Sequence, residues 1–340
     1  MNYDWRIIGH EKVLERLEKD IENQNIASAY LFVGAEEIGK YRIAKTFCKI
    51  LQSGGDFSFD NEVSRQIDKN IHPNVITVDA LWQKDKMEKL EIIAKKSNFD
   101  QSERKRKKMS TDIISIDDVH AFTAPLYDKS GYNYKICLIK NLHRMNNSSA
   151  NAFLKILEEP PRNTIFIMTC THEHLLLETI ISRARVFQFN LVKRGVLEDY
   201  FNQNYPNLGT EDREEIITMT QGRPSRMVRF LNDRDFLLSE RNFFHDIAGL
   251  LSGGDMIYRM KYAEKLSKED DLEVFFDRFI HFLRSLLIEK INKKSLPLSK
   301  KLSYNQIRTL IENTREAHRK VLQSVNKRLV IENLFLSFPE

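Results

Sequence analysis

The sequence has few cysteines and no long apolar segment, and each shortage excludes a class of protein. Its three cysteines, Cys48, Cys137 and Cys170, are odd in number, far apart and each set in an apolar run, so we expect buried, reduced thiols. This pattern excludes a disulfide framework and a cysteine-based metal knuckle. No stretch approaches the roughly 20 apolar residues that span a membrane, and the first residues contain no uninterrupted apolar core. We therefore expect a cytoplasmic protein without a membrane partner.

The net positive charge of the chain comes from a single segment. Residues 83–110 contain ten Lys or Arg against five Asp or Glu, and this surplus of five equals the net charge of the whole chain, +5. The run 104–108 is entirely basic and could contact phosphates without reading sequence. The alternative is a solvated loop, which is the commoner role of a charge run in a polar insertion.

Short apolar runs rich in β-branched and aromatic residues alternate with amphipathic stretches up to about residue 190. This alternation predicts an α/β core in which helices cover a mostly parallel sheet. Helical periodicity then replaces the strand pattern, and the phenylalanines between 230 and 282 recur at a spacing that favours a helical core. The expected strands are 29–33, 74–78, 135–139, 164–168 and 185–189.

These changes of pattern predict three domains. An α/β core covers residues 1–189 and carries the basic insertion at about 83–110. A small helical lid covers residues 190–237, and an all-helical domain covers residues 238–340.

The segment after the first expected strand fits the phosphate-binding loop pattern G-x-x-x-x-G-K. Gly34 and Gly39 would let backbone N–H groups surround a phosphate at a helix N-terminus, and Lys40 would add a positive charge. The preceding strand and the following amphipathic stretch are the context that this motif requires. However, Tyr41 occupies the position at which Ser or Thr would bind magnesium.

A second departure follows the strand 135–139. One or two carboxylates at this point normally hold the magnesium ion and polarise the attacking water. Lys140 and Asn141 stand there instead. A cation and an amide cannot replace those carboxylates, so both metal-binding parts of the site are missing and we expect no ATP hydrolysis by this chain.

The stretch from 142 to 189 is far more specific than the loop. ANAFLKILEEPP at 150–161, the strand TIFIMT and then Ser182, Arg183 and Ala184 resemble bacterial sliding-clamp loader subunits, in which a helix ending LLK-x-LEEPP leads to a sensor strand and an SRC motif. HPNV at 72–75 and NKRLVIENLFLSF near the C-terminus are similar to further family segments. The resemblance covers nearly the whole chain except the basic insertion.

Within this AAA+ family, the sequence most resembles the delta-prime branch of the DNA polymerase III clamp loader, whose members share the motor fold but do not hydrolyse ATP. Residues 53–71 lack the four cysteines of the family's usual zinc module, so we expect no zinc. Ala184 replaces the SRC cysteine. Ser225 replaces a phosphate-sensing arginine of the lid, and Arg226 lies one residue out of register with that position.

The resemblance implies that Arg183, preceded by Ser182, is an arginine finger acting on ATP held by a neighbouring subunit, where it would stabilise transition-state charge. The alternative is a surface arginine paired with a nearby acid. Gly34, Gly39 and Lys40 would then form a vestigial site that retains at most nucleotide or phosphate binding.

The implied partners are gamma/tau-like and delta-like subunits in a hetero-pentameric ring assembled through the C-terminal helices. The sliding clamp would be an indirect partner, and any DNA contact would be to the phosphate backbone. Two other functions stay open: an ATP-hydrolysing gamma/tau-like motor subunit, and a stand-alone nucleic-acid-binding AAA+ protein that uses the insertion.

Glu158 and Glu159 indicate a helix end before Pro160 rather than an acid/base pair. His172 and His174 are expected to be solvated loop residues.

Overall fold

The computed structural model describes residues 3–54, 57–78, 113–127, 134–252, 255–268, 272–291, 302–323 and 326–339. The basic insertion at 83–110 lies outside the described residues. The chain forms two compact units. The first comprises Met1–Pro206 with Gly222–Ser225, and the second comprises Asn207–Gln221 with Arg226–Glu340.

The first unit is built on a five-stranded sheet in the order β2-β3-β4-β1-β5, and every pairing is parallel. Each expected strand is confirmed, with the ends displaced by at most two residues. The order places β1 and β4, the two longest strands, at the centre, where both edges of each are paired. The strands are β1 (Ala29–Gly34), β2 (Val75–Val78), β3 (Lys135–Ile139), β4 (Thr164–Cys170) and β5 (Arg185–Phe189).

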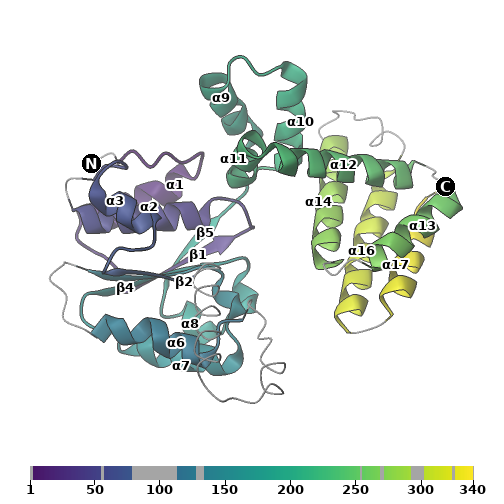
Figure 1. Cartoon of the computed structure of the whole chain (residues 1–340). Helices are drawn as coiled ribbons and strands as arrows, with labels where there is room; N and C mark the ends of the chain where they lie inside the picture. The colour runs from purple at the N-terminus through teal and green to yellow at the C-terminus, as the bar shows by residue number, and fades with distance from the viewer. Residues whose placement is uncertain are drawn as a thin grey trace, which may run out of the picture. The chain divides into compact units, whose positions relative to one another are not determined.

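Helices cover both faces of this sheet (Figure 1). Alternate residues of β1 enter different cores: Tyr30 and Phe32 pack with α1 and α2, whereas Leu31 and Val33 pack with α6 and α7. Burial on both faces explains why the strand is a continuous apolar run. The helices of this unit are α1 (Glu11–Glu22), α2 (Lys40–Ser53), α3 (Glu62–Asp68), α6 (Ile116–Thr123), α7 (Asn147–Glu158), α8 (Glu178–Ile181) and α9 (Arg194–Asn204).

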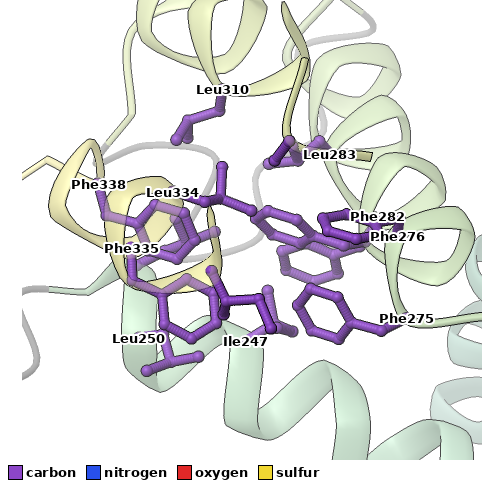
Figure 2. Packing of buried hydrophobic residues seen from close by; sticks show 14 of the residues in the cluster. Ile247, Leu250, Phe275, Phe276, Phe282, Leu283, Leu310, Leu334, Phe335 and Phe338 are labelled. Atoms are coloured by element: carbon purple, nitrogen blue, oxygen red, sulfur yellow. The ribbon is translucent and has the colours of Figure 1, made fainter. Parts of the chain in front are cut away.

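The second unit is helical throughout its described residues apart from the connections. A core rich in phenylalanine holds it together, as expected for the phenylalanines between 230 and 282. Figure 2 shows Phe275, Phe276 and Phe282 on one side of this core and Phe335 and Phe338 on the other. Its helices are α10 (Thr210–Thr220), α11 (Pro224–Asn232, which begins in the first unit), α12 (Arg234–Leu251), α13 (Met256–Ser267), α14 (Leu272–Ile291), α16 (Tyr304–Leu322) and α17 (Lys327–Leu336).

Charged side chains interrupt even the longest of these helices. In the part of the chain that the structure describes, no helix combines the length and apolar character needed to cross a membrane. The division into three domains, with boundaries at 189 and 237, stays a prediction.

Candidate functional site

The phosphate-loop motif lies in the connection between β1 and α2. Gly34 ends β1 with φ of 154°, and Gly39 precedes the first residue of α2 with φ of 108°. A Cβ atom on Gly34 would lie 2.4 Å from the carbonyl oxygen of Phe189 in the neighbouring strand β5. Only glycine fits this close approach. The structure therefore brings Gly34, Gly39 and Lys40 together in one loop, as the motif predicts.

The ammonium of Lys40 is bound by its own loop. The residue is only 6% exposed, and Nζ donates hydrogen bonds to the carbonyl oxygens of Gly34 at 2.5 Å and Ala35 at 2.6 Å. The pKa of Lys40 is lowered to about 8, mainly by burial; the positive charges of Arg223 and Lys140 contribute to this shift and Glu36 opposes it. Two of the three ammonium protons are thus directed at backbone rather than at the space a phosphate would occupy.

The positions that would normally hold magnesium contact each other. Lys140 follows β3 and Tyr41 is the second residue of α2, and the Nζ atom of Lys140 lies 5.3 Å from the centre of the Tyr41 ring. This is a cation–π contact. Asn141 adopts a left-handed conformation with φ of 59° and donates its backbone N–H to Thr169 Oγ1 at 3.0 Å. The Lys140 ammonium thus lies against the Tyr41 ring, and these are two positions at which the sequence predicts a departure from a magnesium site.

Ser225, the second residue of α11, also contacts the loop. The backbone N–H of Ser225 donates to the carbonyl of Glu37 at 3.0 Å, within the first unit. Arg226 extends elsewhere: in the second unit its guanidinium is buried and pairs with Glu240 at 2.6 Å. Arg223, which the sequence alone did not single out, is 7% exposed, and its charge acts on Lys40. The signal that could have identified it is its position two residues before Ser225, in the segment Gly222-Arg223-Pro224-Ser225.

Arg183 lies in the short segment between α8 and β5. Its Nη2 atom forms an ion pair with Glu158 Oε1 at 2.8 Å, and its Nη1 atom donates to the Thr179 carbonyl at 3.0 Å. Ser182 caps the same helix end by donating its hydroxyl to Thr179 at 3.1 Å. The Arg183 side chain is still 36% exposed. Pairing with an acid is the arrangement that the alternative interpretation expected, but it leaves the arginine accessible.

The pairing of Glu158 with Arg183 was not predicted from the sequence. The expected helix end is confirmed, because α7 ends at Glu158 and the N–H of Glu159 bonds back to Lys155. No sequence signal linked this helix end to Arg183, 25 residues further along the chain.

Comparisons with known proteins identify the family. The family model described as "DNA polymerase III, delta subunit" matches residues 9–193, more than half of the chain. The chain belongs to this family. The delta-prime subunit of DNA polymerase III from Bacillus subtilis is 23% identical to this chain over 359 residues. The aligned region covers 97% of this chain and 96% of that subunit. This assignment agrees with the clamp-loader resemblance of residues 150–161 and 182–184.

Similarity to other members of this AAA+ clamp-loader group is more partial. The tau subunit of Bacillus subtilis is 26% identical over 201 residues, covering 58% of this chain and 31% of its own length. The chain spans about a third of that subunit and about half of the gamma subunits that it matches. A solved gamma-subunit-related protein of Thermotoga maritima covers 94% of this chain at 17% identity, with a TM-score of 0.38 that adds nothing to the assignment.

Among the described residues, no three His, Cys, Asp or Glu side chains are grouped closely enough to hold a metal ion. The rings of His172 and His174 lie 5.3 Å apart. Cys48, Cys137 and Cys170 are buried, as expected, and burial raises the pKa of Cys48 to about 12.

Proposed function

We propose that this chain is a non-hydrolysing, delta-prime-like subunit of a cytoplasmic DNA polymerase III clamp loader. It supplies Arg183 to ATP bound by a neighbouring motor subunit and helps to load the sliding clamp on primed DNA. The contact between Lys140 and Tyr41, at the two positions where magnesium ligands would stand, carries this proposal.

Charge and shape both disfavour hydrolysis at the chain's own loop. A magnesium ion near Lys140 would meet a like charge, and Tyr41 offers a ring where a small hydroxyl is needed. The ammonium of Lys40 would have to leave two carbonyl oxygens before it could bind a phosphate. We therefore propose that the chain works without zinc or a hydrolysable nucleotide of its own, with residual phosphate binding as the most that the loop retains.

The partial exposure of Arg183 supports the finger. Its guanidinium carries five N–H donors, and the described contacts with Glu158, Thr179 and Ser182 use at most three of them. At least two donors remain for an anion supplied by another subunit. The partners of this proposal are gamma/tau-like and delta-like subunits in a hetero-pentameric ring, with the sliding clamp as an indirect partner and DNA contacted through its phosphates.

Similarity to tau and gamma subunits favours a second candidate, an ATP-hydrolysing motor subunit of the same loader. The two candidate functions predict opposite results for ATP hydrolysis by the purified chain. Magnesium-dependent ATP hydrolysis by the chain alone would identify a motor subunit, whereas the proposal expects hydrolysis only from its partners.

The test reconstitutes the full chain with the motor and delta-like subunits of its own loader and measures DNA-stimulated ATP hydrolysis in a single turnover. Arg183→Ala should slow hydrolysis at the site that receives the finger, where such arginines contribute on the order of 10³-fold. Assembly of the ring should be unchanged. Arg162→Ala, which removes another exposed arginine of the same unit, is the matched control. If the partner subunits hydrolyse ATP at the same rate with Arg183→Ala, the proposed finger role of Arg183 is refuted.

A further inference from the structure

The ion pair between Arg183 and Glu158 joins two separate elements at the residue on which the proposed function depends. Glu158 is the last residue of α7, and Arg183 follows α8. We propose that Glu158 is a positioning residue that holds the Arg183 guanidinium in the orientation used toward the neighbour's nucleotide. This inference rests on the proposed function and extends it to a second side chain.

The helix that carries Glu158 is held in place by packing. α7 is fixed to the sheet by Phe153 and Leu157, which are 0% and 6% exposed. The helix is closed at its C-terminal end by the bond from the Glu159 N–H to the Lys155 carbonyl, and Pro160 prevents its continuation. The Glu158 carboxylate therefore extends from a rigid helix end, and its direction is set by the packing of α7.

Arg183 is held at both terminal nitrogens. Glu158 binds Nη2 from α7, while the Thr179 carbonyl binds Nη1 from α8. Two contacts at different nitrogens fix the plane of a guanidinium as well as its location. Without Glu158, the backbone carbonyl and the weak 3.5 Å contact with Ser182 would remain. The long arginine side chain would then sample several rotamers and present its free donors in the right direction for only part of the time.

The expected effect is modest because the pair is exposed. The side chains of Arg183 and Glu158 are 36% and 51% accessible, and exposed ion pairs of this kind change populations by a few-fold. We expect Glu158→Ala to lower kcat of the partner ATPase two- to five-fold, far less than loss of the finger itself. KM for ATP should not change, because Glu158 lies on this chain and not in the pocket that binds the nucleotide.

A control is provided by the adjacent residue. Glu159 is also an exposed carboxylate, but successive residues at a helix end point about 100° apart, and among the described residues no ion pair is formed by Glu159. Glu159→Ala removes the same charge from the same helix end without freeing Arg183.

The experiment measures kcat and KM for ATP in the reconstituted loader with Glu158→Ala, Glu158→Gln, Glu159→Ala, Arg183→Ala and the double variant Glu158→Ala/Arg183→Ala. Glu158→Gln keeps the length and a hydrogen-bond acceptor, so it should restore part of the lost kcat. In the Arg183→Ala background, Glu158→Ala should have no further effect, because its only role is to place Arg183.

The outcomes separate this inference from the proposed function. If Arg183→Ala slows the ATPase but Glu158→Ala does not, the positioning role is wrong and the finger stands. A faster ATPase with Glu158→Ala would also overturn the inference, since Glu158 would then restrain the finger rather than align it. A loss of kcat shared by Glu159→Ala, or retained in the double variant, would show a general charge effect. If Arg183→Ala has no effect, the proposed function fails and this inference with it.

Discussion

Glu240 is predicted to be the most sensitive charged residue of the helical unit. It lies on α12 and is 3% exposed. Its carboxylate pairs with Arg226 of α11 at 2.6 Å and with Arg278 of α14 at 2.9 Å. Arg278 also donates to the Ser239 carbonyl at 3.1 Å. One carboxylate thus neutralises two guanidiniums and joins three helices within the second unit. Glu240→Gln would keep the shape of the side chain and remove only its charge.

The size of the effect follows from burial. The side chains of Arg226 and Arg278 are 8% and 23% accessible, so water replaces the lost carboxylate poorly. Removing one partner of a buried ion pair costs about 3–5 kcal/mol, because the other charge stays buried and uncompensated. The unit contains about 130 residues. At this size 1 kcal/mol corresponds to roughly 3–5 °C, so the melting temperature of this unit should fall by about 9–25 °C.

The assay is thermal unfolding of the full chain by calorimetry, with hydrogen exchange to assign the loss of protection to α11, α12 and α14. Glu215→Gln is the matched control, because Glu215 also pairs with an arginine, Arg241, but both side chains are at least 32% accessible. That pair should contribute no more than about 1 kcal/mol. Equal shifts for Glu240→Gln and Glu215→Gln would refute the reasoning and show that the buried pair contributes no more than a surface pair.

Two further predictions concern the loop. Gly34→Ala should destabilise the first unit by about 2–4 kcal/mol, since the new Cβ would lie 2.4 Å from the Phe189 carbonyl, whereas Gly195→Ala, with no atom within 4 Å, should be neutral or slightly stabilising. Denaturant midpoints check this, and equal midpoints would contradict it. Burial lowers the pKa of Lys40 from 10.5 to about 8, so between these values the unfolded chain binds a proton that the native chain has released, and the unfolding free energy should rise with pH. Lys40→Met should abolish that rise between about pH 8 and 10.5, and an unchanged pH dependence would count against the shift.

The strands of the sheet could be predicted from the sequence because each is a short apolar run rich in residues that favour extended backbone. β3 is buried at all five positions, and after Lys135 it is an unbroken apolar run. β5 alternates near its end, where Gln188 is exposed between Phe187 and Phe189, both buried. Such patterns follow from burial on one or two faces and need no knowledge of the neighbouring strands. The loop glycines were predictable for the same reason, since their requirement is local.

The contacts of the site could not be predicted, because they depend on the order of the strands. Tyr41 and Lys140 are about a hundred residues apart, and they meet because β4 alone separates β3 from β1. The sequence predicted each replacement separately but not that the two side chains contact each other. Likewise, the pairing of Arg183 with Glu158 requires the end of α7 to lie beside the segment before β5.

The glycine–lysine motif does not by itself indicate that a nucleotide binds here. Gly34 is required by its approach to β5, where any side chain would meet the Phe189 carbonyl. A buried ammonium must be paired or hydrogen-bonded whether or not a phosphate is present, and the carbonyls of Gly34 and Ala35 meet that need for Lys40. Both residues therefore have structural reasons to be present whether or not a nucleotide binds. Arg183, in contrast, is partly exposed and its ion pair lies at the surface. This accessibility is what the proposed contact with a partner's nucleotide requires.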